Sequence, residues 1–267
     1  MLGKMVLFAL ALVAVVPLQV MAEETKKIQD NSFLLEEAYN QEDGVVQHIQ
    51  VLQYMKKSKS WQYSFTQEWP APKQAHQLSY TIPVAHLDGS DTTRIGDIAL
   101  NYRYQAVFKD HIALSPRLSF ILPTGDYKKS MGTDSIGIQV NIPLSVELSD
   151  RFVTHWNIGS TYTPNSRESG GAKADTTAFN YGASVIYLAT ENFNVMLEAV
   201  GTSGESVQSD ASKQRVDTFF INPGVRFAIN FKSGLQIVPG ISVPIGVGPS
   251  AGEFGGLAYL SFEHPLF

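Results

Sequence analysis

The sequence predicts an all-β protein, a twelve-stranded antiparallel up-and-down transmembrane barrel with a short N-terminal segment in its lumen. Three observations predict it: a secretion signal, alternation of apolar and polar side chains, and connections that alternate between long and short. Charged residues make up 17% of the 267, below the roughly 25% typical of soluble domains. With no cysteine and a net charge of −5, the chain lacks a disulfide framework and gives no electrostatic case for nucleic-acid binding.

Residues 1–22 have the pattern of a secretory signal peptide. Lys4 supplies a positive charge, Met5–Val16 is apolar, and residues 20–22 read Val-Met-Ala, a small-x-small cleavage site. The apolar run is too short for a membrane anchor. We expect cleavage after Ala22, and a place of action beyond the inner membrane.

Residues 23–44 form an acidic N-terminal segment without an alternating apolar face. Their apolar residues could occupy one side of a short helix, whereas the simplest alternative is a disordered periplasmic tail. Apolar side chains are poor residues to leave in water, and a twelve-strand barrel has room for a peptide. We therefore expect residues near 30–42 to narrow the lumen as a plug, with Glu36 or Glu37 available to a lumenal arginine. The expected plug residues are Phe33, Leu34, Glu36, Glu37 and Tyr39.

From Val45 to Phe267 the sequence tends to alternate with period two, which a strand produces and a helix does not. In the clearest stretch, residues 136–146, the even positions are apolar and most odd positions are polar or glycine. The predicted strands are 45–54, 61–69, 75–84, 94–106, 111–122, 135–147, 152–163, 177–189, 193–200, 216–229, 235–247 and 256–267.

The connections between these strands form two classes. Every odd-numbered connection, such as 164–176 and 201–215, is longer than every even-numbered one. Outer-membrane barrels show this asymmetry, with short periplasmic turns and long extracellular loops. An even number of strands also returns both ends of the barrel to the periplasmic side.

A soluble β-sandwich is the alternative fold. Against it, the polar faces are rich in Gly, Ser, Asn, Gln and Thr rather than the Lys and Glu of soluble surfaces. Aromatic residues also lie near many strand ends, as in interfacial girdles. Seven prolines, for example Pro116 and Pro244, fall inside predicted strands. Because proline cannot donate to a ladder, we expect bulges or split strands there.

The polar face carries ionisable residues that would line the lumen. They are Glu68, Asp97, Arg103, Arg117, Glu147, His155, Glu198, Arg226 and Glu263. Charges in a narrow lumen must pair or remain hydrated, so the structural interpretation is a network that braces the wall. The functional interpretation is a lining that contacts a permeating solute, and the near balance of sign argues against a strongly selective ion pore.

Four segments of the chain are distinctive: QDNSFLLEEAYNQE at 29–42, IGDIALNY at 95–102, LPTGD at 122–126 and YLSFEHPLF at 259–267. Together they resemble an outer-membrane family labelled "putative meta-pathway of phenol degradation". The resemblance implies a bacterial outer-membrane barrel with a transport role and no catalytic residues. The terminal Phe267 resembles the closing aromatic that such proteins present to the outer-membrane assembly machinery, although Pro265 interrupts the ladder just before it.

We expect a channel or transporter for small solutes, including aromatic or hydrophobic ones, with the lipid bilayer as its surroundings and no cofactor. The alternative is a lipid-modifying hydrolase of the outer membrane. The six histidines show no His-x-x-x-His or similar metal-ligand spacing. Residues 248–252 match the Gly-x-Ser-x-Gly elbow by letter only, because a predicted strand follows where the elbow needs a helix.

Overall fold

The computed structural model describes residues 28, 30–88 and 93–266. The predicted signal peptide, residues 1–22, and Phe267 therefore lie outside the described residues. The described part is almost entirely strand, with two 3-10 turns, η1 at Tyr127–Lys129 and η2 at Gly248–Ser250. The strands are β1 Val45–Met55, β2 Ser60–Pro70, β3 His76–His86, β4 Arg94–Ile95, β5 Ile98–Tyr104, β6 Val107–Lys109, β7 Ile112–Leu114, β8 Arg117–Leu122, β9 Gly137–Ser149, β10 Phe152–Arg167, β11 Lys173–Thr190, β12 Phe193–Val207, β13 Lys213–Phe227, β14 Ile229–Asn230, β15 Gln236–Ser242, β16 Ile245–Gly246 and β17 Gly255–Pro265.

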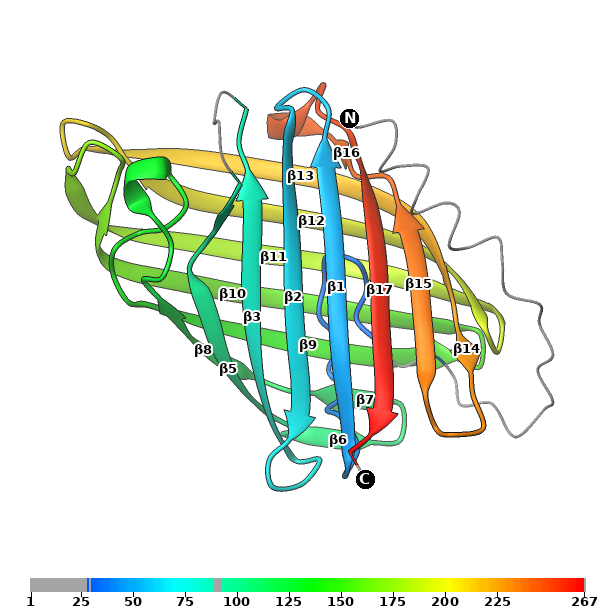
Figure 1. The fold of residues 1–267 in the computed structure, drawn as a ribbon. Helices are drawn as coiled ribbons and strands as arrows, with labels where there is room; N and C mark the ends of the chain where they lie inside the picture. Colours follow the sequence, from blue (N-terminus) through cyan, green and yellow to red (C-terminus); the bar gives the residue numbers. More distant parts are fainter. Residues whose placement is uncertain (1–27, 29, 89–92, 267) are drawn as a thin grey trace.

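These segments form one antiparallel sheet that closes on itself (Figure 1). Some consecutive strands are pieces of one crossing of the barrel wall, which we call a span. β4, β5 and β6 form one span, β7 and β8 another, β13 and β14 a third, and β15 and β16 a fourth, so the ring has twelve spans. β1 pairs with β2 on one side and with the last strand, β17, on the other, from Val45 opposite Pro265 to Met55 opposite Gly255. The predicted twelve-strand barrel is confirmed. We call the end that carries Val45 and Pro265 the terminal end, and the opposite end the distal end.

Prolines explain several of the interruptions. Pro116 separates β7 from β8, and Pro244 lies between β15 and β16, as the sequence predicts for residues without a ladder donor. Other prolines remain inside strands and serve as acceptors. The carbonyl oxygen of Pro143 accepts from the N–H of Ser115, and that of Pro223 accepts from the N–H of Val243.

The outer wall of the ring is apolar and the inner wall is polar. Along β9, the side chains of Val140 and Ile142 are 43% and 41% exposed, whereas Asn141 between them is 2% exposed. A closed barrel satisfies its backbone hydrogen bonds internally, and an apolar exterior then suits hydrocarbon rather than water. This pattern establishes the transmembrane-barrel interpretation over the soluble sandwich. Among the described residues, no helix has the length and hydropathy to cross a bilayer.

The two faces of β9 provide a direct test of orientation. Val140→Arg should destabilise the folded barrel by roughly 2–4 kcal/mol, because it places a charge on the lipid face. Gln139→Arg is the matched control: Gln139 accepts from Arg117 and donates to Thr161 on the inner side, where an added charge remains hydrated. Urea titrations in detergent micelles would measure both. Equal destabilisation by the two substitutions would contradict this orientation.

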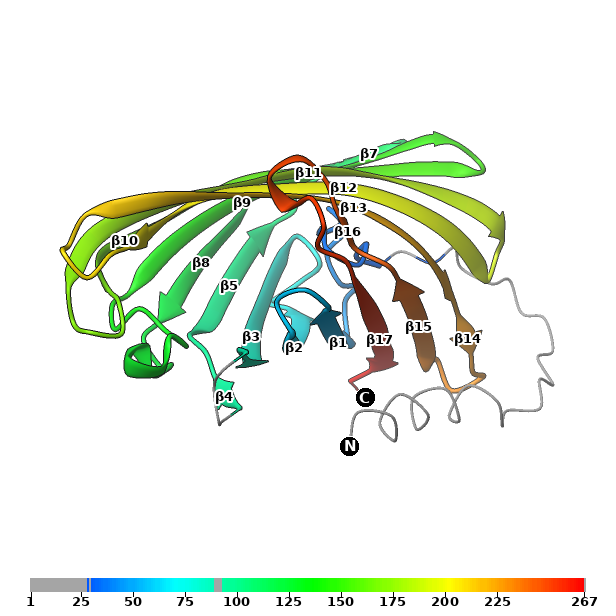
Figure 2. The same cartoon turned by 90° about the horizontal axis from the view of Figure 1, so that it is seen from above.

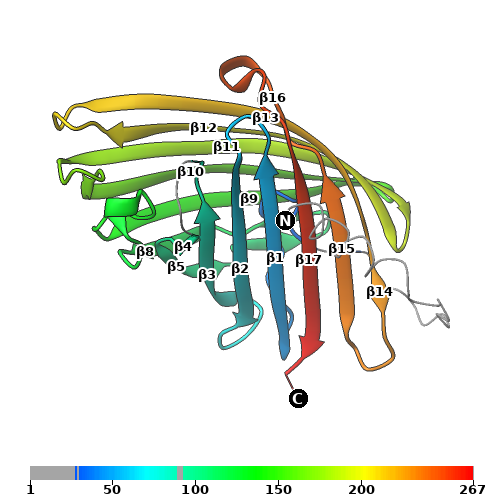
Figure 3. The same ribbon diagram turned by 45° about the horizontal axis from the view of Figure 1, so that its top comes forward.

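The predicted difference between long and short connections holds only in part. β10 to β13 are 15 to 18 residues long, against 11 for β1 to β3, and they extend well beyond the other strands (Figure 3). The predicted connections 164–176 and 201–215 therefore shrink to 168–172 and 208–212. The short connection 168–172 is fastened by Glu168, whose pKa is lowered by hydrogen bonds from the backbone N–H groups of Gly170 and Ala172.

Candidate functional site

Residues 30–42, called the lumenal segment below, lie inside the ring between its two walls (Figure 2). Phe33 is 4% exposed and Glu37 is 2% exposed, so the segment is enclosed rather than trailing in solvent. The segment has bends at 33–35 and at 38 but no helix. The short helix that the apolar residues could have formed is therefore not present in residues 30–42.

Side chains of the wall hold the backbone of the lumenal segment. Instead of pairing as a strand, the segment is held by side-chain oxygen atoms of different strands, each of which accepts a hydrogen bond from one backbone N–H group. The N–H of Leu34 donates to Glu198 Oε1 (2.9 Å), that of Glu36 to Asn157 Oδ1 (3.1 Å), that of Ala38 to Ser145 Oγ (2.8 Å) and that of Gln41 to Gln77 Oε1 (2.8 Å). These acceptors come from β12, β10, β9 and β3. These four amide donors have partners outside the segment, so they are not available for the internal hydrogen bonds of a helix.

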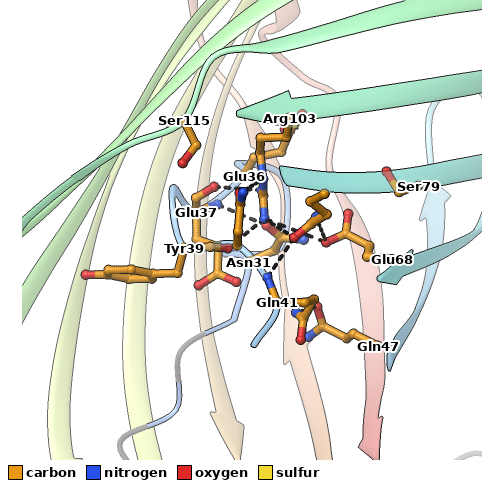
Figure 4. Close-up of polar contacts among 12 residues, drawn as sticks. Asn31, Glu36, Glu37, Tyr39, Gln41, Gln47, Glu68, Ser79, Arg103 and Ser115 are labelled. Carbon is orange, nitrogen blue, oxygen red and sulfur yellow. Dashed lines mark hydrogen bonds and ion pairs between the residues drawn. The ribbon is translucent and has the colours of Figure 1, made fainter. Parts of the chain in front are cut away.

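Two arginines of the inner wall contact the middle of the lumenal segment, and Figure 4 shows one of them, Arg103, among its partners. Arg117 forms an ion pair with Glu36, with 2.7 Å between Nη2 and Oε1. Arg103 donates from Nη1 to the carbonyl oxygen of Glu37 (3.0 Å) and from Nη2 to that of Tyr39 (2.6 Å). The Arg103 guanidinium also lies 3.8 Å from Glu68. Both guanidinium groups therefore serve as fixed donors for the segment.

Asp30 anchors the start of the lumenal segment to the seam between β1 and β17. Its side chain is almost fully buried and accepts hydrogen bonds from Gln47 of β1 and from Tyr259 and Ser261 of β17. Arg226 of β13 donates to the carbonyl oxygens of Asp30 and Asn31. The first residue of the segment thus depends on strands from both ends of the barrel sequence.

Asp30→Ala should detach this anchor. The substitution leaves three buried wall donors without an acceptor, at about 1–3 kcal/mol for each unsatisfied group, and water entering the lumen would then compete with the segment. We expect faster proteolysis within residues 30–42 while the barrel stays intact, measured by limited digestion and mass spectrometry. Asp30→Asn, which keeps one acceptor oxygen, should have a smaller effect. Digestion at the wild-type rate in Asp30→Ala would contradict the anchoring role.

Glycines of the wall leave room for the apolar side chains of the segment. A Cβ atom placed on Gly240 would lie 2.7 Å from Cε1 of Phe33, and one on Gly182 would lie 2.8 Å from Cδ2 of Leu35. Phe33 also packs edge-on against Tyr259, with ring centroids 5.9 Å apart. Glycine at these two positions thus leaves the space that the apolar side chains of the segment occupy.

The remaining predicted lining residues lie in different surroundings. Glu198 accepts from Asn222 as well as from the segment. The Oε1 atom of Glu263 lies 3.5 Å from the side-chain Nε2 atom of Gln41. Asp97 instead fastens the distal connection 123–136, because it accepts from the backbone of Gly125 and Thr133. Glu147 lies 3.3 Å from His111 and lines, with His155 and Tyr39, a small pocket that is partly open to solvent.

One Ser–His pair occurs in the inner wall. Ser145 Oγ lies 2.7 Å from Nδ1 of His155, but the serine is fully buried and its oxygen already accepts from the N–H of Ala38. A substrate carbonyl therefore has no approach to this hydroxyl. Ser250 of the Gly-x-Ser-x-Gly sequence lies in η2 with β17 following, and its hydroxyl accepts from the N–H of Phe219. Neither serine has the surroundings of an activated nucleophile.

Sequence reasoning missed most of the neutral polar residues that hold the segment. Gln47, Gln77, Ser145 and Asn157 are buried and bind it directly. A usable signal was present, because each lies on the polar face of an alternating strand. Amide side chains on such a face can offer both a donor and an acceptor to an unpaired backbone.

Comparisons with known proteins agree with this architecture. The family model described as "Putative MetA-pathway of phenol degradation" matches residues 54–249. Among solved structures, the COG4313 outer membrane channel from Pseudomonas putida F1 has a TM-score of 0.63 at 10% identity, covering 92% of this chain and 99% of that chain. The NanC porin has a TM-score of 0.52 at 8% identity, covering 82% and 100% respectively. At these identities the solved structures show a shared fold, and no curated protein matches the chain in sequence.

Proposed function

This chain belongs to the family described as "Putative MetA-pathway of phenol degradation", and from that premise we propose that it is an outer-membrane channel for small solutes, narrowed by its own lumenal segment. The observation that carries the proposal is a closed barrel with an apolar exterior whose polar interior holds residues 30–42. The terminal end then faces the periplasm and the distal end the outside of the cell. β17, with Phe267 beyond it, is the segment that the assembly machinery would recognise.

Several polar side-chain atoms on β12, β13 and β15 are buried without a partner among the described residues. Both side-chain polar atoms of Asn194, the Oδ1 atom of Asn222 and the hydroxyl of Ser242 are buried without a hydrogen-bond partner among the described residues. Asn194 and Asn222 lie on β12 and β13, and Ser242 lies on β15, which pairs with β13. Buried polar groups of this kind usually bind ordered water.

We propose small, including aromatic, molecules as the solutes, since the plugged lumen restricts size and the family description concerns phenol degradation. The proposal assigns no catalytic residue, because the one Ser–His pair described above is covered by the segment. In this proposal the lumenal arginines and carboxylates mainly hold the segment in place. A solute would contact them only where they are exposed next to the segment.

Flux measurements in liposomes test the proposal. Benzenesulfonate and cyclohexanesulfonate form a matched aromatic and aliphatic pair that does not cross lipid unaided, and arabinose and raffinose are neutral probes of different size. We expect flux of arabinose above that of raffinose, and of the aromatic above the aliphatic sulfonate. Flux equal to that of empty liposomes for all four solutes would overturn the channel. Equal flux of the two sulfonates would overturn the aromatic preference alone.

A further inference from the structure

Two histidines meet on the outside of the barrel where its first and last strands join. His48 lies on β1 and His264 on β17, and their Nε2 atoms are 3.2 Å apart. Their rings are nearly parallel, with 5.3 Å between centroids and 19° between planes. The pair lies at the terminal end of the seam, in the register where Val46 faces His264 and His48 faces Phe262.

The alternation of the strands places both rings on the outer face. Gln47 and Glu263, the residues next to them, contact the lumenal segment or its neighbours on the inside. His48 also stacks on Phe65 of β2, with centroids 6.0 Å apart. The two imidazoles are therefore separate from the lumenal site and near the membrane surface on the terminal side.

A hydrogen bond determines which nitrogen of His264 carries the proton. Its Nδ1 atom lies 2.8 Å from the carbonyl oxygen of Pro265, and a carbonyl can only accept, so Nδ1 carries the hydrogen. The Nε2 atom of the neutral ring then has a free lone pair directed at His48. Histidines that bind metals typically donate their other ring N–H to a carbonyl or carboxylate in this way.

We propose that His48 and His264 bind one divalent transition-metal ion, of the class of Zn²⁺, Cu²⁺ or Ni²⁺, through their Nε2 atoms. Two nitrogen ligands at about 2.0–2.1 Å from a tetrahedral zinc ion are about 3.3–3.4 Å apart. The Nε2 atoms of His48 and His264 lie 3.2 Å apart, close to that separation. Imidazole suits these ions and not Mg²⁺ or Ca²⁺. To bind, His48 moves its proton from Nε2 to Nδ1, and no other bond changes. Water completes the coordination.

Such an ion would link the first strand to the last strand across the closing seam. Because it binds the closed barrel and not the separated strands, it stabilises the closed form by mass action. The site does not depend on the solute or on the lumenal segment. Its test is therefore independent of the proposed channel.

The experiment uses the full mature protein, folded in detergent and stripped with EDTA. Zn²⁺ is titrated calorimetrically, and the temperature at which the folded gel band converts to the unfolded band is recorded with and without 1 mM Zn²⁺, a concentration about 1,000-fold above a Kd of about 1 μM. We expect one Zn²⁺ per chain and a higher conversion temperature. His48→Gln and His264→Gln should each weaken binding at least tenfold and remove the shift. Cu²⁺ electron paramagnetic resonance should show coordination by two imidazole nitrogens.

His76 and His86 supply matched controls, since each lies on β3 and stacks on an aromatic ring, Tyr102 and Trp61 respectively. His76→Gln and His86→Gln should bind Zn²⁺ as the wild type does. No binding by the wild type at 1 mM Zn²⁺, or binding that is unchanged in both His48→Gln and His264→Gln, would overturn the proposal. If either variant fails to assemble, the Cu²⁺ spectrum of the wild type decides, and a spectrum without two imidazole nitrogens overturns it.

Discussion

Deleting residues 24–42 is expected to raise the flux of small solutes through the reconstituted barrel several-fold while leaving the barrel folded. The wall does not need the segment for its ladder, because the twelve spans pair with one another around the whole ring. Side chains that now bind the segment, such as Arg103 and Arg117, would be hydrated instead. The cost of losing those contacts is small in a water-filled lumen, and the passage becomes wider.

Liposome swelling with arabinose and raffinose would measure the change, and gel mobility before and after heating would verify the fold. A synthetic peptide with the sequence of residues 24–42, added to the deleted barrel, should lower the flux again. A peptide of the same composition in scrambled order is the matched control. Unchanged flux after deletion, together with rapid digestion of the segment in the intact protein, would show that the segment is only a tail.

Gly240→Val is expected to displace the lumenal segment without removing it. The new side chain would collide with the ring of Phe33 and press on Arg226, whose Cβ lies 3.1 Å from the Cβ position of residue 240. Phe33 is enclosed, so its ring can avoid the new side chain only if the segment shifts. Arg226 is the donor to Asp30 and Asn31. We expect both faster digestion of the segment and higher solute flux.

Gly204→Val is the matched control, since the nearest atom to its Cβ position is Cβ of Ala178 at an ordinary 3.5 Å. A double variant, Gly240→Val with Phe33→Ala, should restore protection of the segment because the smaller side chain makes room. If Gly240→Val leaves the segment as protected as in the wild type, the close approach of Phe33 to the wall has no role in holding it.

The wall could be predicted from sequence because one face of each span must meet lipid. Period two assigned Val140 to the outside, and the structure agrees. The ends of β11 to β13 were not predictable in the same way. Residues such as Gly204 and Glu205 pair with Val216 and Arg215 beyond the apolar zone, and polar residues in a hairpin outside the membrane resemble a loop in sequence.

The contacts of the lumenal segment depend on the closed ring. An acidic and apolar stretch before the first strand indicated a plug, and Glu36 indeed lies against Arg117. The arginine that Glu36 meets depends on where the strand that carries this arginine lies around the ring. The alternation of residues along the sequence does not give that position. The helix that the apolar residues would have allowed does not form, for a related reason. Helix formation satisfies amide groups internally, but the wall offers acceptors such as Glu198 and Asn157 to those same amides.

The anchoring of Asp30 has a consequence for the order of assembly. Its partners Tyr259 and Ser261 are synthesised last, and they reach Gln47 of β1 only when β17 has joined β1. Asp30 can therefore make its full set of contacts only after the last strand is in position. Its engagement would then mark a barrel whose construction is complete.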